Sequence, residues 1–551
     1  MQQLVLLYIF LLLAGTLVLA ALAVYRMMSG SSMASRLPGG WWLPVSVSAL
    51  ALALRLWCVP SMHHVYYDEF AYMAEAHNIL CFAHPGQVLR GSRSAPEIFS
   101  ASANLRTGFP VLLALAEATV PDMCIEHPAA PEQAERRLFW LNIGLGVLSV
   151  AMLYRIILRA TATASLAGWS AVVLAVLPAH IKYSASLSAD VSVLFFFLLS
   201  LMCLLEWAAV RQKLFMLTAL FAGAYSACIK PIYLPFLAVA LLAVTVPLYR
   251  RKELRGRELG DILYYACCTL LPLALFLAPG AASETHGRSD LLYSWGHWQK
   301  NILPNLLSLL DRREFNVVAS LLALAGLGWV VTRRRDGFIM AMMLWFCLGF
   351  ILLAGYFAGG LSYQSFTTSD RFFFVIAAPF ALLAAVGARS VCVLVGRWGR
   401  SAALAAATLM LVALCVNGIY ASRHIVAYTS TRFVYKQWLF VRKTAPLLPA
   451  DAALVCADSA FISVMTAQKV LRGDLFLSGD RPLRIVYYTS SGCPGAAPEV
   501  RSLGQVIRSQ YTCDLLYESL LPGAEGCTLR AQLCTKAAPA PTSSKAASAV
   551  P

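Results

Sequence analysis

The chain has 551 residues, of which 59% are hydrophobic and only 13% are charged. A soluble chain carries about 25% charged residues, so this composition cannot cover a water-soluble surface of this size. Disorder, collagen and coiled coil are excluded by the same numbers, which predict a membrane protein with many spans. The net charge of +16 indicates either nucleic-acid binding or Lys and Arg gathered in cytoplasmic loops, and the positions of these residues decide between the two.

Twelve apolar stretches are long enough to cross a hydrocarbon layer of roughly 30 Å, which takes about 20 residues. Their approximate limits are 4–25, 41–59, 138–156, 163–180, 188–210, 214–231, 232–249, 261–280, 315–332, 337–357, 372–393 and 401–420. The first stretch has no positive charge before it and exceeds the length of a signal-peptide core of about 7–15 residues. We therefore expect it to be a retained helix.

Basic residues fall mainly in alternate short loops, which we expect to be cytoplasmic by the positive-inside rule. These loops hold Arg26, Arg36, Arg155, Arg159, Arg211, Lys213, Arg250, Arg251, Lys252, Arg255, Arg257, Arg333, Arg334, Arg335, Arg389, Arg397 and Arg400. The long loop 60–137, the loop 281–314 and the tail after residue 420 then lie on the other side. No loop interleaves basic and aromatic residues as a nucleic-acid-binding patch would, so nucleic acid is not an expected partner.

Two regions outside the membrane are large enough to fold. The loop 60–137 exceeds a plain connection of about 12–15 residues, and its apolar spacing around 71–80 and 105–120 predicts two helices along the membrane surface. The tail 421–536 is predicted to be a small extracytoplasmic α/β domain, with strands at 453–457 and 483–488 and helices at 459–470 and 499–511. The last stretch, 537–551, is rich in Ala, Pro and Ser and is predicted to be disordered.

Fourteen of the 15 cysteines are assigned to a side. Those in apolar spans are expected to be small core residues: Cys203, Cys228, Cys267, Cys268, Cys347, Cys392 and Cys415. Those on the outer side are Cys81, Cys124, Cys456, Cys493, Cys513, Cys527 and Cys534, where an oxidising compartment permits disulfides. Five of these lie in the tail, which leaves at least one unpaired within it, and the Cys513–Cys534 region is a candidate for a bond. The absence of CxxC and of matching His spacing argues against a zinc site.

Ionisable residues that sit where the outer loops meet the bilayer are the candidate site residues, because such groups are costly unless they face a cavity or a partner. Asp68 and Glu69 follow the second span within a run of aromatic residues. Two adjacent carboxylates can serve as a general base and as an anchor for a hydroxyl or a cation. The alternative is that they are first-turn acids of the helix that follows.

Further candidate groups stand at the outer ends of later spans. Lys182 and Asp190 lie in one outer turn, where Asp190 could simply cap a helix. Lys230 could be an ordinary snorkelling lysine, and Arg371, which follows a polar loop containing Tyr363, could pair with a neighbouring acid or with lipid headgroups. Together these groups supply acids to deprotonate a hydroxyl and bases to hold a phosphate, as sugar transfer from a lipid phosphate carrier requires.

The order of these motifs over roughly residues 41–390 resembles the polytopic C-superfamily (GT-C) glycosyltransferases, and is similar to the protein O-mannosyltransferases and the lipid A aminoarabinose transferases. The motifs are Asp68-Glu69 inside Tyr67–Tyr72, the run from Arg137-Leu138 through Pro178–Ser184 to Asp190, Ala227–Pro231, and Asp370-Arg371-Phe372. Relatives carry Thr before the lysine of the third motif, where this chain has Ile229. Many also carry Tyr after the arginine of the fourth, where Phe372 keeps the aromatic ring but lacks the hydroxyl.

The resemblance implies an α-helical polytopic membrane protein of about 12 transmembrane helices, GT-C type, with a small C-terminal α/β extracytoplasmic domain. It implies an inverting glycosyltransferase that moves a sugar from a polyprenyl-phosphate-linked donor to an acceptor hydroxyl on the extracytoplasmic face. Asp68 would then be the general base and Glu69 would position Asp68 or the acceptor. The substrate-binding residues would be Asp190, Lys182, Lys230, Tyr363 and Arg371. No cofactor is certain, and the resemblance leaves open whether a divalent metal ion bridges the phosphate, because relatives differ.

The predicted spans and tail, together with the resemblance, divide the chain into an extra N-terminal transmembrane helix with a cytoplasmic loop (1–40), a GT-C-like transmembrane catalytic domain (41–420) with the first outer loop 60–137, the extracytoplasmic domain (421–536) and the disordered tail (537–551). The expected location is the plasma (inner) membrane, and the expected partners are the polyprenyl-phosphate sugar, a lipid, glycan or protein acceptor, and the bilayer. Two alternatives remain. One is a transporter or flippase of lipid-linked sugars, although such proteins commonly show inverted repeats and none is found in the sequence. The other is a non-catalytic subunit of an envelope-assembly complex.

Overall fold

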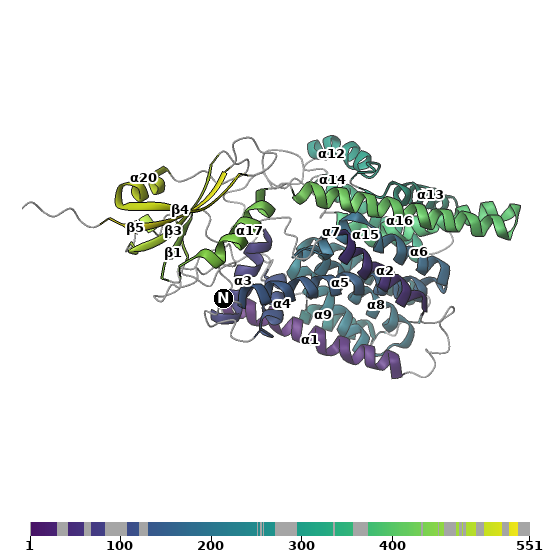
Figure 1. The fold of residues 1–551 in the computed structure, drawn as a ribbon. Coiled ribbons are helices and arrows are strands. Elements are labelled where there is room, and N and C mark those ends of the chain that lie inside the picture. The colour runs from purple at the N-terminus through teal and green to yellow at the C-terminus, as the bar shows by residue number, and fades with distance from the viewer. Residues whose placement is uncertain are drawn as a thin grey trace, which may run out of the picture.

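The structure is a computed structural model. It describes residues 2–29, 42–59, 68–82, 107–120, 130–250, 252–253, 256, 258–269, 295–313, 315–333, 337–355, 373–430, 433–449, 451–456, 470–472, 476–477, 481–491, 501–520 and 528–537. Within these ranges the chain forms a large helical bundle and a small sheet domain at one end of it (Figure 1).

The bundle confirms the predicted polytopic helical fold. Seven described helices are long and apolar enough to cross a membrane, or eight if one bent pair counts as a span. The seven are α1 (Gln2–Ser29), α5 (Ala130–Thr161), α8 (Ala189–Val210), α10 (Leu234–Arg250), α14 (Gly337–Gly355), α15 (Phe374–Val395) and α16 (Arg400–Ser430). Three other predicted stretches form helices of 17 residues, namely α2 (Trp42–Cys58), α9 (Lys213–Ile229) and α13 (Val317–Arg333). The stretch 261–280 is described as a helix only over 258–269.

The predicted stretch 163–180 is not one continuous helix. It divides into α6 (Ala164–Ala175) and α7 (Pro178–Ser184), which are bent by 62°. Leu177 is extended, as the residue before a proline tends to be, and Pro178 opens α7 at a position where the missing N–H costs nothing. The break turns α7 away from α6 and leads the chain into the turn before α8.

Helix α8 is the centre of the bundle. All of its residues from Ala189 to Leu204 are buried, as expected for a helix that is apolar on every side. Peripheral helices differ, since only 11% of the apolar window of α16 and 22% of that of α1 are buried. The first turn of α8 is therefore a buried position for any polar side chain.

Two helices of the first loop are present as predicted, α3 (Asp68–Phe82) and α4 (Gly108–Glu117). The rings of Tyr72 and Phe109 join them edge to face at 5.1 Å. Gly108 lies directly on the end of α9, because a Cβ there would come within 2.7 Å of the Cys228 carbonyl carbon, and the Tyr225 hydroxyl donates to the Gly108 carbonyl at 2.6 Å. The loop helices are thus fixed to the last turn of α9. We call this end of the bundle, where α2 ends and α3 begins, the α3 end.

The tail forms the predicted α/β arrangement. One five-stranded sheet has the order β2-β1-β3-β5-β4, with β1 parallel to β2 and β3, and with β5 antiparallel to β3 and β4. The strands are β1 (Ala453–Cys456), β2 (Val470–Arg472), β3 (Arg484–Ser491), β4 (Tyr511–Leu520) and β5 (Thr528–Lys536). Helix α20 (Arg501–Gln510) covers one face through Leu503 and Ile507, and α17 (Phe433–Thr444) covers the other, where the rings of Phe440 and Tyr488 lie 6.1 Å apart.

Some details of the tail differ from the prediction. The helix predicted at 459–470 falls outside the described residues except for Val470, which begins β2. The helix predicted at 499–511 is α20, which ends at Gln510 because Tyr511 starts β4. Strands β2, β4 and β5 were not predicted. The stretch predicted to be disordered lies, beyond Ala537, outside the described residues.

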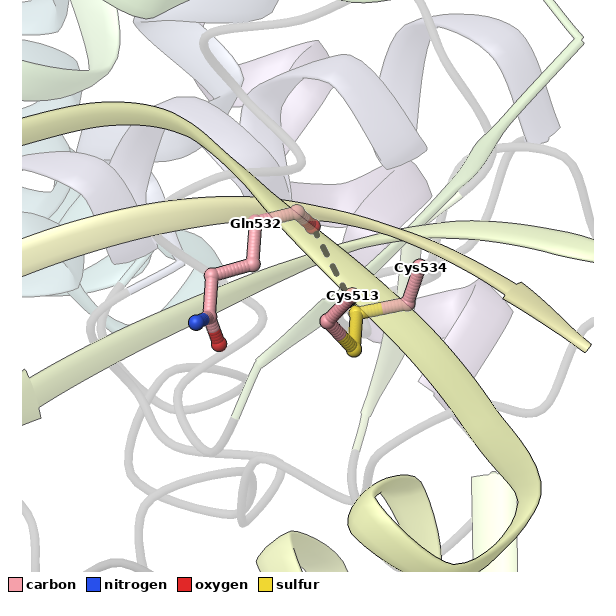
Figure 2. The surroundings of a disulfide bond; sticks show 3 residues. All are labelled: Cys513, Gln532 and Cys534. Atoms are coloured by element: carbon pink, nitrogen blue, oxygen red, sulfur yellow. Dashed lines mark hydrogen bonds between the residues drawn. A yellow bond between two sulfur atoms is a disulfide. The ribbon is translucent and has the colours of Figure 1, made fainter.

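A disulfide bond joins β4 and β5. Cys513 and Cys534 are directly paired across the two strands and are bonded to each other (Figure 2), which confirms the expected bond in this region. Cys81 in α3 is also disulfide-bonded, to a partner outside the described residues. The seven cysteines of the apolar spans are free, as expected, although Cys267 and Cys268 are exposed.

Helix α17 attaches the sheet domain to the α3 end of the bundle (Figure 1). The Trp438 indole donates to the Glu135 carboxylate of α5 at 3.1 Å, and Arg442 forms an ion pair with Glu132 at 2.8 Å. On its other side, the Thr444 hydroxyl lies 2.9 Å from the Tyr488 hydroxyl of β3. The sheet domain is therefore held beside the loop helices.

Candidate active site

An ion pair joins α8 and the end of α9 at the α3 end of the bundle. The Lys230 amine donates to Oδ1 of Asp190, and the two side chains are 20% and 6% exposed. Ser188, the N-cap of α8, donates its hydroxyl to Oδ2 of Asp190 at 2.9 Å and accepts from the Asp190 backbone N–H at 3.2 Å. Both oxygens of this carboxylate are engaged. Asp190 is thus more than a first-turn acid, and Lys230 has a carboxylate partner that simple snorkelling would not supply.

A break in the helical backbone sets the position of Lys230. The residue is extended, with φ −144° and ψ 110°, because Pro231 follows it. Its N–H still donates to the Ser226 carbonyl at 2.9 Å, and the chain then makes a single 3₁₀ turn, η1 (Pro231–Tyr233), before α10 begins. The lysine side chain therefore leaves from a short rigid corner.

Glu69 connects the first loop to the turn before α8. The residue is 2% exposed, and its Oε2 accepts from the Leu187 backbone N–H at 3.0 Å. On the other side of this turn, the Asn142 amide of α5 donates to the Tyr183 carbonyl at 2.8 Å and to the Ser186 carbonyl. The segment that carries Asp190 is therefore held from α3 and from α5.

The remaining predicted residues are described to different extents. Lys182 is 3% exposed, and its amine lies 4.6 Å from the centre of the Tyr183 ring, which is a cation–π distance. Asp68 opens α3 directly before Glu69, and only its backbone is described. Tyr363 and Arg371 lie outside the described residues. The structure thus brings Asp190 and Lys230 into contact and attaches Glu69 to the same turn.

A buried charge that the sequence analysis passed over lies beneath α7. Arg55 of α2 is fully buried; its guanidinium donates to the Ala51 carbonyl and, at 2.5 Å, to Nδ1 of His180. Close by, Gly146 of α5 leaves no room for a side chain, since a Cβ would lie 2.3 Å from the Ser184 hydroxyl and 3.3 Å from Nε of Arg55. Arg55 lies inside the apolar stretch 41–59, and a charged residue in such a stretch usually has a buried partner. The sequence therefore already indicated a contact of this kind.

A second carboxyl on α3, Glu75, was also passed over, although it lies two turns after Asp68 and hence near the same helix face. Burial raises the pKa of Glu75 to about 7, while a hydrogen bond with Thr107 opposes the shift. Thr107 is the residue before Gly108, where α4 meets α9. A carboxyl that stays protonated until neutral pH therefore sits between the two loop helices.

The stability of the protein is expected to fall as pH rises from about 4.5 to about 7. In this window the folded state keeps a proton on Glu75 that the unfolded chain, with an ordinary pKa near 4.5, has already released. The Glu75→Gln variant should lack that part of the slope. Thermal unfolding midpoints of the two proteins in detergent across this range measure the difference. Parallel curves for both proteins would contradict the assigned burial.

A metal ion has no evident ligands in the part of the chain that the structure describes, since no group of three His, Cys, Asp or Glu side chains there could hold one. What the described residues do provide is a largely buried lysine held by a carboxylate. A phosphate oxygen can compete for such an amine through charge-assisted hydrogen bonds.

This helical architecture, with two loop helices over one end and a sheet domain beside them, is similar to the fold of two solved structures of ArnT. Residues 130–286 match the family model of dolichyl-phosphate-mannose-protein mannosyltransferase. This matched region includes Lys182, Asp190 and Lys230.

Two solved structures share the fold over most of the chain. One is ArnT from Cupriavidus metallidurans in the apo state, with 9% sequence identity, a TM-score of 0.55, and coverage of 88% of this chain and 97% of that one. The other is ArnT from the same organism bound to undecaprenyl phosphate, with 10% identity, a TM-score of 0.52 and the same coverage. No curated protein matches the chain in sequence.

Proposed function

We propose that the protein is an inverting membrane glycosyltransferase that transfers a sugar from a polyprenyl-phosphate-linked donor to an acceptor hydroxyl on the extracytoplasmic face. The observation that carries the proposal is the largely buried Lys230–Asp190 pair, held on the turn that Glu69 fixes beside the start of α3. The fold supports it, because one of the structures that share it contains undecaprenyl phosphate.

The reaction is a single displacement at the anomeric carbon. Asp68 accepts the proton of the acceptor hydroxyl while the hydroxyl oxygen forms a bond to that carbon. The bond between the carbon and the phosphate oxygen breaks, and the electron pair leaves with the polyprenyl phosphate. Attack from the face opposite the leaving group inverts the configuration.

Basic side chains hold the departing phosphate. Lys230 supplies one positive charge, and Arg371 supplies a second in a geometry suited to paired phosphate oxygens. Asp190 accepts a hydrogen bond from the Lys230 amine, so this lysine, whose side chain is only 20% exposed, has a compensating charge beside it. Lys182 and Tyr363 complete the proposed donor-binding set, and Glu69 acts by fixing the turn that carries Asp190.

The sidedness of the site is inferred from two features. Disulfide-bonded cysteines lie in α3 and in the sheet domain, and disulfides persist in oxidising compartments outside the cytoplasm. At the opposite end of the bundle, Arg155 and Arg159 both form ion pairs with Glu206, at 3.1 and 3.2 Å. Basic residues gathered at this end are what the positive-inside rule predicts for the cytoplasmic side. Both features support an extracytoplasmic site in a plasma (inner) membrane.

The acceptor is expected to be selected by the loop helices and the sheet domain. Helix α17 holds this domain at the α3 end through Glu132 and Glu135 of α5. We take residues 41–420 as the catalytic unit and 421–536 as the domain that contributes to the choice of a lipid, glycan or protein acceptor.

Reconstitution in proteoliposomes tests this function. The purified protein is given a polyprenyl-phosphate sugar labelled in the sugar, together with a crude envelope extract as acceptor source. We expect label to leave the donor lipid and appear in an acceptor, only when donor and acceptor share the side that bears the sheet domain. Movement of intact labelled lipid across the bilayer without any chemical change would support a transporter and overturn the proposal.

A further inference from the structure

Tyr233 has a buried hydroxyl to which the proposed reaction assigns no role. The residue is 1% exposed and ends η1, the 3₁₀ turn that follows Lys230. Its backbone N–H donates to the Lys230 carbonyl at 3.2 Å. Because the turn is short and begins with Pro231, the positions of Lys230 and Tyr233 are fixed relative to each other.

The ring of Tyr233 is packed, whereas its hydroxyl is not satisfied. The ring lies 5.3 Å from that of Phe197 on α8, two turns below Asp190. The hydroxyl is buried and has no hydrogen-bond partner among the described residues. The Asp190 oxygens accept from Lys230 and Ser188, and neither accepts from Tyr233.

A buried tyrosine hydroxyl normally finds a partner, because leaving it without one forfeits the hydration it had in the unfolded chain. Phenylalanine would fill the same space at this position without that loss. A second donor in the same aromatic cluster, Nε1 of Trp345, is also buried without a partner in the described part of the chain, and the Trp345 ring lies 5.1 Å from Phe197. One of these two donors, the Tyr233 hydroxyl, belongs to the turn that follows Lys230, and a ligand with acceptor oxygens bound at that lysine could supply its missing partner.

We propose that Tyr233 is a further donor-binding residue, whose hydroxyl donates a hydrogen bond to a phosphate oxygen of the polyprenyl-phosphate sugar beside Lys230. The inference rests on the proposed function and extends it to a residue outside the motifs of the resemblance. In this proposal Lys230 pairs with the charge of the phosphate. Tyr233, which ends the short turn after Lys230, donates an uncharged hydrogen bond to the same phosphate. A phosphate oxygen of the lipid-linked sugar thereby supplies the hydrogen-bond acceptor that the described residues do not provide.

The Tyr233→Phe variant removes only the hydroxyl and tests the inference. We expect the KM for the polyprenyl-phosphate sugar, and the Kd for radiolabelled undecaprenyl phosphate in nanodiscs, to rise about tenfold, the loss of one hydrogen bond to a charged group. The thermal midpoint without ligand should stay the same or rise, because an unsatisfied buried group is removed. A purely structural role would not produce this combination of equal or higher stability and weaker binding.

A matched control is Tyr154→Phe. Tyr154 is 2% exposed, and its hydroxyl too is buried with no partner within the described ranges, but it lies on α5 near Arg155 at the opposite end of the bundle. This variant should leave the Kd and KM for the donor unchanged. An equal loss of binding in both variants would show a general effect on the bundle and would overturn the inference.

The remaining outcomes separate the inference from the proposed function. If the wild-type protein binds undecaprenyl phosphate and Tyr233→Phe binds it equally well, the inference is wrong and the proposed function stands. If the variant loses thermal stability while its binding is unchanged, the hydroxyl serves packing and the inference is likewise wrong. If the wild-type protein neither binds the lipid nor uses the labelled donor, the proposed function and the inference are both overturned.

Discussion

Replacement of Asp68 by asparagine is expected to lower kcat by about 10²- to 10⁴-fold, the usual contribution of a positioned general base. The amide has nearly the shape of the carboxyl group, so α3 should begin as before, but it cannot accept the proton of the acceptor hydroxyl. The Kd for undecaprenyl phosphate should change little, because the phosphate is assigned to basic residues on other elements. Initial rates with saturating donor and lipid binding in nanodiscs measure the two quantities separately.

The control for this variant is Glu75→Gln, the same carboxyl-to-amide change two turns along α3. It should retain nearly the wild-type rate. A wild-type rate in Asp68→Asn would remove Asp68 from the chemistry, and an equal loss in Glu75→Gln would indicate a general disturbance of the helix.

The Lys230→Met variant is expected to show two large effects. The KM for the donor should rise by roughly 10- to 100-fold, as one charge-assisted contact to the phosphate is lost. The protein should also lose about 3–5 kcal/mol of stability, because the Asp190 carboxylate, whose side chain is 6% exposed, loses the cation beside it. Donor titrations and unfolding midpoints in detergent follow the two effects.

A double variant, Lys230→Met with Asp190→Leu, separates the two roles of the lysine. Removing the carboxylate as well should restore most of the lost stability, since a buried ion pair can often be replaced by apolar residues, while the KM for the donor stays high. Recovery of donor use together with stability would mean that the pair is structural and that Lys230 does not bind the phosphate.

The sequence predicted the helices of the bundle well because a long apolar run is stable in the hydrocarbon layer, where a helix satisfies all of its backbone hydrogen bonds. It failed at 163–180, where the apolar run continues through Leu177 and Pro178 and hydropathy does not register the 62° bend. Two strands of the tail were missed for a related reason. β4 carries a bulge between Leu515 and Tyr517, and the buried positions of β5 do not keep a period of two, so neither strand shows clean alternation.

The candidate site was predictable as a set of residues rather than as a geometry. Asp190 and Lys230 stand 40 positions apart, and nothing in the sequence pairs them. Their contact depends on the packing of α8 against α9, and the attachment of Glu69 to the Leu187 N–H depends on the turn that follows the bend. The contact between Arg55 and His180, which joins α2 to α7, likewise follows from tertiary packing.

If the proposed function is correct, donor lipid is consumed by glycosyl transfer at the α3 end of the bundle. Mass spectrometry of the lipids in reconstituted vesicles, supplied with polyprenyl-phosphate sugar and acceptor extract, measures this consumption most directly. We predict that free polyprenyl phosphate appears in amounts equal to the sugar gained by the acceptor, and that Asp68→Asn lowers the initial rates of both by about 100-fold or more while Glu75→Gln preserves both. Donor that stays intact with the wild-type protein, or equal release of polyprenyl phosphate by wild type and Asp68→Asn, would contradict the account.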